Sequence, residues 1–215
     1  MNKVTTIDEV KEKFIEGMTV MIGGFMGVGT AEKLVDAVVE KGVKDLTVIC
    51  NDAATPGTGA GKLVRAKVIK KYITSHIGLN PELGKQMSDE EVEVELAPQG
   101  TLVERIRSGG FGLGGVLTPT GVGTEVEEGK QKITIEGKEY LVELPLKGDV
   151  ALVKAYRCDK AGNVVFRKSA RNFNPIIAMA CDFVVVEAEH IDEIGEIDPD
   201  HVMLPGIFVD AIIQG

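Results

Sequence analysis

Four glycines fall within seven residues near the start of the chain, in the run Gly23-Gly24-Phe25-Met26-Gly27-Val28-Gly29. The run follows an apolar stretch, Val20–Ile22, of the kind that forms a strand buried on both faces. Thr30 comes next as a candidate N-cap, and the apolar spacing beyond it predicts a helix from Ala31 to Gly42. A strand, a glycine-rich turn and a helix N-terminus together make a socket for an anion, because backbone N–H groups can approach a ligand closely there.

The glycine spacing differs from two familiar phosphate-binding motifs. It reads Gly-Gly-x-x-Gly-x-Gly, so the dinucleotide fingerprint G-x-G-x-x-G is absent. Gly61-Lys62 resembles the end of a P-loop, but Pro56 stands where the first glycine belongs and Leu63 where Ser or Thr belongs. A nucleotide-dependent dehydrogenase and a Mg-nucleotide hydrolase are therefore disfavoured. On this stretch alone, a tight turn in some other α/β enzyme remains open.

The elements that must position this turn read as an α/β fold with a mostly parallel central sheet flanked by helices. Leu46–Asn51 predicts a second strand, which makes a β-α-β unit with a right-handed crossover. We expect one domain over residues 1–215, because no linker, repeat or low-complexity tract interrupts the chain. Further strands are expected at Lys70–Ser75, at Val92–Leu96 near a sheet edge, at Val150–Tyr156, at Val164–Phe166 and at Phe183–Val186, with a hairpin over residues 132–143 turning at Glu136-Gly137.

Acidic residues, prolines and a capping box predict several further helices. Short helices are expected at Asp8–Ile15 and after Pro81, and Pro175 can open another. Thr101 with Glu104 forms an S/T-x-x-E capping box, which predicts a helix that ends at Gly109-Gly110. The stretch over residues 109–124 is rich in Gly and Thr, which predicts a loop that approaches a ligand or a neighbouring subunit. A flexible surface loop is the alternative.

Composition narrows the functional classes. The 215 residues are 44% hydrophobic and carry a net charge of −9, which argues against nucleic-acid binding. No apolar run approaches the roughly 18 residues of a membrane helix, and the N-terminus has no signal-like apolar region. The three cysteines Cys50, Cys158 and Cys181 lie in or beside apolar runs and are expected as buried thiols in a reducing cytoplasm. The three histidines lack ligand spacing, so no metal site is expected.

Several segments, taken together, resemble one family. Gly23-Gly24-Phe25 followed by Gly29 is similar to a signature of the α subunits of class I coenzyme A transferases, although that signature continues with a proline that this chain lacks. Four further stretches match segments of the same family, and the likeness spans almost the whole chain. They are Pro98-Gln99-Gly100-Thr101-Leu102, Thr118-Pro119-Thr120-Gly121-Val122-Gly123-Thr124, Lys154–Asn163 and Arg171-Asn172-Phe173-Asn174-Pro175.

The resemblance implies the CoA-transferase fold, which is similar to that of sugar-phosphate isomerases, and a defined reaction. A glutamate carboxylate attacks an acyl-CoA thioester, the CoA thiolate then attacks the resulting anhydride, and an acceptor carboxylate takes CoA from the glutamyl thioester. In the family this glutamate lies in a Ser-Glu-Asn-Gly motif of the β subunit, and this chain has no such motif. The chain is therefore expected to be an α subunit that needs a β subunit, in an α₂β₂ assembly.

The resemblance also implies the site residues. Gln99 is expected to stabilise the oxyanion through its side-chain amide, with a loop hydrogen bond to backbone as the alternative role. Acetyl-, butyryl- or acetoacetyl-CoA is the expected donor and a short-chain carboxylate the acceptor, with CoA as substrate and no tightly bound cofactor. A 3-oxoadipate CoA-transferase subunit, a sugar-phosphate isomerase-like enzyme and a scaffolding subunit stay open. CoA binding is expected at Gly24, Phe25, Met26, Gly27, Val28, Gly29 and Thr30.

Overall fold

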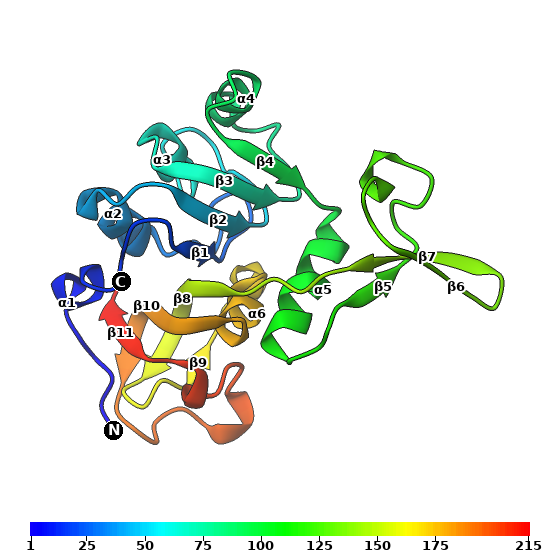
Figure 1. Cartoon of the computed structure of the whole chain (residues 1–215). Helices are drawn as coiled ribbons and strands as arrows, with labels where there is room; N and C mark the ends of the chain where they lie inside the picture. The colour runs from blue at the N-terminus through cyan, green and yellow to red at the C-terminus, as the bar shows by residue number, and fades with distance from the viewer.

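An eight-stranded sheet forms the centre of the molecule, and the computed structural model describes every residue from Met1 to Gly215 (Figure 1). Seven strands lie in the order β11-β10-β8-β1-β2-β3-β4, and every neighbouring pair in this order is parallel. The eighth strand, β9, runs antiparallel to the end of β8. The predicted α/β fold with a mostly parallel sheet is confirmed.

Aliphatic runs build the central strands, which are largely buried because helices cover both of their faces. β4 lies at the edge of the sheet, as its alternating sequence predicted. The strands are β1 (Thr19–Ile22), β2 (Leu46–Cys50), β3 (Ile69–Thr74), β4 (Glu93–Leu96), β8 (Gly148–Asp159), β9 (Val164–Val165), β10 (Cys181–Asp192) and β11 (Ala211–Gln214).

The helices divide into two layers. Buried residues of α1 to α4 join one hydrophobic core with Val20 and Ile22 of β1, whereas α5 and α6 join a second core with Met21. Because successive side chains of a strand point to opposite faces, the two cores lie on opposite sides of the sheet. The helices are α1 (Ile7–Lys11), α2 (Glu32–Lys41), α3 (Gly61–Arg65), α4 (Pro81–Ser88), α5 (Gln99–Gly110) and α6 (Asn174–Met179), with 3-10 helices η1 (Glu125–Glu127), η2 (Lys168–Arg171), η3 (Pro199–His201) and η4 (Gly206–Phe208).

The glycine turn follows the strand at which the chain changes direction across the sheet. From β1 the chain moves outward through β2 and β3 to β4, and it later returns to β8 on the other side of β1. In open α/β sheets, ligands bind at the carboxyl ends of the strands at such a switch point. The loops that follow β1, β2 and β4 are therefore the first place to look for a site.

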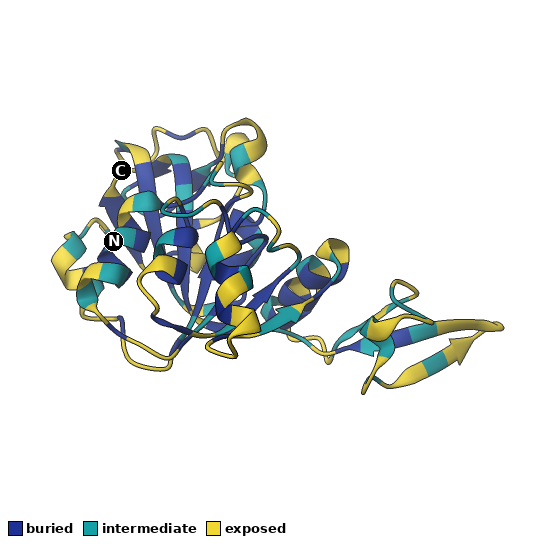
Figure 2. Ribbon diagram, turned by 90° about the horizontal axis from the view of Figure 1, so that it is seen from above, coloured by how far each residue is buried: buried dark blue, intermediate teal, exposed yellow.

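A second, antiparallel sheet stands apart from the first. It contains β5 (Val116–Thr118), β7 (Lys138–Glu143) and β6 (Lys132–Ile135) in that order. Figure 1 shows it projecting beyond α5, and Figure 2 shows that most of it is exposed. Leu141 and Glu143 are its buried residues. The predicted hairpin is confirmed, and both Glu136 and Gly137 have the positive φ that a two-residue turn requires.

Local differences from the sequence predictions concern element lengths. The first helix is shorter than predicted and begins after Thr6, whose hydroxyl accepts a hydrogen bond from the Glu9 amide. β8 and β10 each run for twelve residues and extend beyond their predicted apolar centres. α3 was not predicted.

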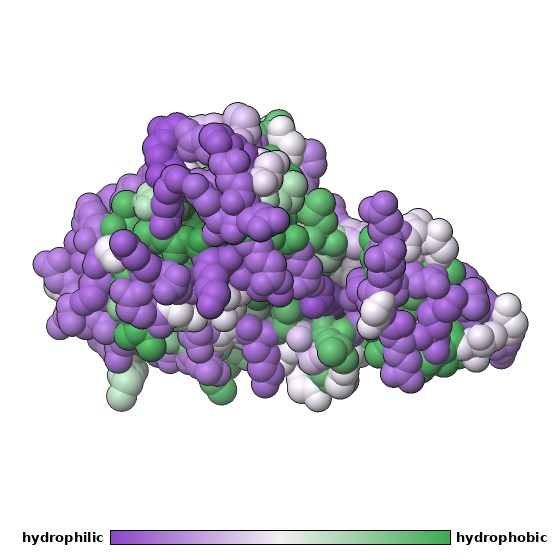
Figure 3. Space-filling model, turned by 45° about the horizontal axis from the view of Figure 1, so that its top comes forward, coloured by the Kyte–Doolittle hydropathy of each residue, from purple (hydrophilic) through white to green (hydrophobic).

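No helix has the length and apolar character needed to cross a membrane, and hydrophilic residues cover most of the face seen in Figure 3.

Candidate functional site

The glycine turn is a small exposed hairpin at the carboxyl end of β1. The backbone amides and carbonyls of Phe25 and Val28 form two reciprocal hydrogen bonds of 3.0 and 2.9 Å. Met26 and Gly27 connect them with φ angles of 49° and 83°, as in a type I′ turn. The side chains of Phe25, Met26 and Val28 are about half exposed. The turn therefore presents both backbone and apolar surface to a ligand.

Two asparagines hold this hairpin against the rest of the fold. The Asn172 side chain accepts a hydrogen bond from the Gly24 amide (3.0 Å) and donates one to the Val28 carbonyl (2.9 Å). The fully buried Asn174 donates to the Gly29 carbonyl (2.9 Å) and accepts from the Lys154 amide (2.9 Å). Both asparagines belong to the Arg-Asn-Phe-Asn-Pro segment. That segment therefore sets the position of the turn, a role the sequence alone did not reveal.

Close packing explains why two of the glycines cannot carry a side chain. A Cβ at Gly24 would lie 2.1 Å from Thr30 Oγ1, and the φ of +128° there is accessible to glycine alone among common residues. A Cβ at Gly29 would lie 2.6 Å from the Ala170 carbonyl oxygen. The turn thus needs glycine to fit the protein, besides any need to approach a ligand.

The helix that follows the turn is capped by a carboxylate from within the chain. The prediction that Thr30 caps it is wrong: the N-cap is Ala31, which has no side-chain capping bond. Glu187 of β10 instead accepts hydrogen bonds from the Lys33 and Leu34 amides at 2.9 and 3.2 Å. This anion already satisfies the end of α2, so the predicted socket at that helix terminus is filled by the protein itself.

Most amides of the turn are also used internally. The amides of Gly24, Phe25, Met26, Val28 and Thr30 bond to protein acceptors. Those of Gly27 and Gly29 have no partner within the chain. Of the amides in the predicted CoA-binding stretch, these two are the ones available to a ligand without breaking a bond.

Buried polar residues connect the turn to Gln99. Asp52, after β2, accepts hydrogen bonds from the Met26 amide (2.9 Å) and from Asn51 Nδ2 (2.7 Å). Asn51 Oδ1 in turn accepts a 2.6 Å hydrogen bond from Gln99 Nε2. The structure therefore links Gln99 and the turn through two buried side chains. Asn51 and Asp52 were not predicted as site residues, and their position directly after a buried strand was the available signal.

A second helix terminus, that of α5, is open. The predicted capping box of Thr101 and Glu104 is wrong, because the N-cap of α5 is Pro98, three residues earlier, and α5 begins at Gln99 with no side-chain cap. The backbone amides of Gln99, Gly100 and Thr101 have no hydrogen-bond partner within the chain. Thr101 Oγ1 is buried and also unpartnered. Because the helix dipole favours negative charge at this end, the Gln99 side chain stands beside free donors.

Part of the projecting sheet faces this open terminus. A cavity of about 320 Å³ separates the start of α5, at Gly100 and Thr101, from β5 and Thr120. The Thr118–Thr124 segment begins on β5 and so borders the same cavity. Two of the matched sequence segments thus meet next to Gln99.

Neither the thiols nor the acidic side chains near the turn are free for nucleophilic chemistry. Burial raises the pKa of Cys50 and of Cys158 to about 12, so thiolate is scarce at neutral pH. Asp52 and Glu187 bond to backbone amides, and Glu32 binds Lys62 and the Gly59 amide. No group of three or more His, Cys, Asp or Glu is placed to hold a metal ion.

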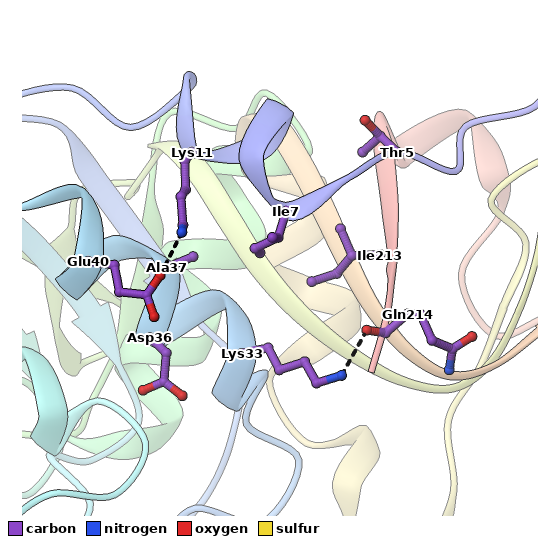
Figure 4. A pocket seen from close by; sticks show the side chains of 9 residues that line it. All are labelled: Thr5, Ile7, Lys11, Lys33, Asp36, Ala37, Glu40, Ile213 and Gln214. Atoms are coloured by element: carbon purple, nitrogen blue, oxygen red, sulfur yellow. Dashed lines mark hydrogen bonds and ion pairs between the residues drawn. The ribbon is translucent and has the colours of Figure 1, made fainter.

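A cavity on another part of the surface is unrelated to this site. It measures about 460 Å³ and lies between α1, α2 and β11 (Figure 4). The lysines that line it are already occupied: Lys11 binds Glu40 and Lys33 binds the Gln214 carbonyl. It shares no residue with the glycine turn or with α5, and we do not assign it to the site.

Comparison with known proteins identifies coenzyme A transferases as relatives over nearly the whole chain. The family described as coenzyme A transferase matches residues 3–215. The chain is 54% identical over 211 residues to the acetate CoA-transferase subunit alpha of Escherichia coli (strain K12), covering 98% of this chain and 96% of that protein. It is 49% identical over 213 residues to the acetoacetyl-CoA:acetate/butyrate CoA transferase alpha subunit of Clostridium acetobutylicum, covering 99% and 98%.

A solved structure supports the fold. The thioester complex with CoA of an acyl-CoA transferase from Escherichia coli O157:H7 superposes with a TM-score of 0.88 at 20% identity. The match covers 100% of this chain and 47% of that one. At this identity the likeness bears on the fold, and the reaction has to be argued from the site and the closer relatives.

Proposed function

This chain belongs to the coenzyme A transferase family and acts in CoA transfer as an α subunit, and from this premise we propose its substrates, its partner and its share of the catalysis. The donor is acetyl-, butyryl- or acetoacetyl-CoA, and the acceptor is a short-chain carboxylate. The partner is a β subunit, in a cytoplasmic heterotetramer of two α and two β subunits. Support comes from the names of the two relatives, which are α subunits of acetate and of acetoacetyl-CoA:acetate/butyrate transferases.

The attacking carboxylate is proposed to come from the partner. A carboxylate that attacks a thioester must be free, yet Asp52, Glu32 and Glu187 near the turn are held by backbone amides or lysine. An acid already bound to several donors is a poor nucleophile, because attack would break those bonds. The internal bonding of these acids therefore supports a division in which the β subunit supplies the glutamate.

This chain is proposed to supply the oxyanion donors. When a carboxylate adds to the thioester carbonyl, negative charge develops on the oxygen and must meet donors that are already oriented. The observation that carries the proposal is the open N-terminus of α5, where the Gln99 side chain stands beside unpartnered backbone amides. Its bond to Asn51 uses one hydrogen of the Gln99 amide and leaves the second for the substrate.

The glycine turn is proposed to contact CoA itself. The free amides of Gly27 and Gly29 can donate to polar groups of the ligand, and Phe25, Met26 and Val28 offer apolar surface to its aliphatic arm. The Asp52–Asn51 connection keeps this contact in a fixed relation to Gln99. CoA is a substrate in this scheme, and no tightly bound cofactor takes part.

The division of labour can be tested by reconstitution. The chain is purified alone and together with its β subunit, and CoA transfer from acetoacetyl-CoA is assayed with acetate, butyrate and 3-oxoadipate as acceptors. Activity is expected only in the mixture, with acetate or butyrate preferred. After incubation with acyl-CoA, mass spectrometry is expected to find the CoA adduct on the β subunit. Full activity from this chain alone, or an adduct on it, would overturn the proposal.

A further inference from the structure

The Gln99 side chain is held at the end of a short chain of hydrogen bonds that starts in the protein interior. Asn51 Oδ1 accepts a 2.6 Å hydrogen bond from Gln99 Nε2, and Asn51 Nδ2 donates a 2.7 Å hydrogen bond to Asp52. Asn51 is 1% exposed and Asp52 is 4% exposed, whereas Gln99 lies on the surface. The contact therefore fixes an exposed side chain to a buried one.

Asp52, at the inner end of this chain, has no freedom to turn. Its Oδ1 accepts a hydrogen bond from the Ala54 amide (2.8 Å), and its Oδ2 accepts one from the Met26 amide (2.9 Å) besides that from Asn51. Its backbone carbonyl accepts a 3.1 Å hydrogen bond from the buried Tyr72 hydroxyl. Any rotation of the Asp52 carboxylate would break at least one of these bonds.

The chemistry of Asp52 decides which way both amides face. An ionised carboxylate can only accept hydrogen bonds, so Asn51 has to turn its NH2 group toward Asp52 and its oxygen toward Gln99. Gln99 must then present its own NH2 group to Asn51, because an oxygen there would face another oxygen. One Nε2 hydrogen of Gln99 is used in this bond, and the second is left with a fixed direction.

A Gln99 side chain without this bond would have a competing partner. The backbone amides of Gln99, Gly100 and Thr101 are unpartnered at the start of α5, and such a helix end attracts any acceptor within reach. The side-chain oxygen of Gln99 is one such acceptor, and a free glutamine also samples many rotamers. The bond to Asn51 orders the amide before the substrate arrives, which is what an oxyanion donor requires.

We infer that Asn51 is a positioning residue for catalysis, which orients the Gln99 amide toward the developing oxyanion, and that Asp52 sets the direction of their hydrogen bond. The inference rests on the proposed function, in which Gln99 is the oxyanion donor. It deepens that function by giving Asn51 an effect on turnover that acts through Gln99 alone. Asn51 itself does not touch the substrate.

A double-mutant cycle on the reconstituted enzyme tests the inference, with CoA transfer from acetoacetyl-CoA to acetate as the assay. Asn51→Ala is expected to lower kcat about 10- to 100-fold, the usual effect of misplacing a catalytic group, with little change in KM for acetoacetyl-CoA. The double variant, Asn51→Ala with Gln99→Ala, should have the same kcat as Gln99→Ala, because Asn51 then has nothing to orient. A double variant whose loss is the product of the two single losses would overturn the inference.

Two further variants separate the orientation of Gln99 from general loosening of the fold. Asn51→Leu keeps the side-chain volume and removes the polar atoms, so it should lower kcat as Asn51→Ala does. Thr74→Val is the matched control, because it removes a buried 3.0 Å hydrogen bond to the Asn51 backbone carbonyl and leaves the Asn51 side chain intact. Its melting temperature should fall while kcat stays near the wild-type value. A kcat as low as that of Asn51→Ala in this control would overturn the inference.

Failure of the inference can be told from failure of the proposed function. If Gln99→Ala alone leaves kcat unchanged, Gln99 is not the oxyanion donor, and the proposed function and the inference fall together. If Gln99→Ala lowers kcat and Asn51→Ala does not, Gln99 needs no positioning by Asn51, and the inference alone fails.

Discussion

The carboxylate of Glu187 accepts a 2.9 Å hydrogen bond from the backbone amide of Lys33. The first turn of α2 is therefore capped by an acid from the centre of β10. The other carboxylate oxygen binds Lys154 Nζ at 2.9 Å. The two residues come from the long neighbouring strands β10 and β8, which lie on the same side of β1. The end of α2 is therefore fixed to the sheet rather than left open for an anion.

Removing this acid should destabilise the fold. Glu187→Ala leaves Lys154 without its partner, and breaking a buried ion pair typically costs about 3–5 kcal/mol, with less expected here because Lys154 keeps some contact with water. Glu187→Gln retains an acceptor for the two amides and should cost less. Urea denaturation of both variants measures the difference in the free energy of unfolding. Equal losses would show that the cap contributes nothing.

Truncation of Gln99 should affect turnover far more than folding. Gln99→Ala is expected to lower kcat about 10²–10³-fold, the usual effect of losing one oxyanion donor. The melting temperature should change little, because Gln99 is exposed and has one side-chain hydrogen bond. Gln131→Ala, which alters an exposed glutamine just before β6, serves as control. Comparable kcat values for the two variants would count against the oxyanion role.

A bulky side chain in the glycine turn should block CoA. A Cβ at Gly27 meets no atom within 4 Å, so Gly27→Trp points its ring into the space where a ligand would approach. CoA exchange by the reconstituted enzyme is expected to be abolished. The positive φ of 83° strains any side chain, and Gly27→Asn controls for this because Asn tolerates such angles. Normal exchange by the Trp variant would favour a scaffolding role for the subunit.

The ion pairs of Glu95, on edge strand β4, with Lys71 and Arg105 should make stability depend on acid pH. Partial burial would raise the pKa of Glu95, but Arg105 and Lys71 outweigh it and lower the pKa. A carboxyl group whose pKa is lower in the folded state stabilises the fold above its unfolded pKa of about 4.3, and this contribution is lost as pH falls through the folded value. Glu95→Gln should therefore destabilise the protein at pH 7 and cost progressively less as the pH falls below the unfolded pKa, as measured by urea denaturation. A cost independent of pH would rule out the ion pairs as its source.

Strands and tight turns were predictable because their signals are local. The aliphatic runs of β1, β2 and β3, the alternation of β4 and the turn at Glu136-Gly137 each follow from neighbouring residues. Helix starts were less predictable: Thr30 and Thr101 have the right chemistry for caps, yet neither caps a helix. At α2 the acceptor comes from a residue more than 150 positions away, which no local rule can identify.

Prediction of the candidate site from sequence has the same limit, because its contacts join distant segments. Motif resemblance identified Gln99 and residues 24–30 as candidates, but it assigned no role to Asn172, Asn174 or Asp52, which hold the turn through contacts between distant segments. These features depend on long-range packing and not on spacing along the chain.

The sequence by itself determined the family, the parallel α/β sheet and the glycine turn. Strand periodicity, glycine content and motif resemblance depend only on residues that are close together in the sequence. Only the tertiary structure decided which helix end can receive negative charge. Glu187 fills the terminus of α2, whereas nothing in the chain fills that of α5 beside Gln99. The physical reason is that a helix terminus attracts any acceptor within reach, and the fold alone determines which acceptors are within reach.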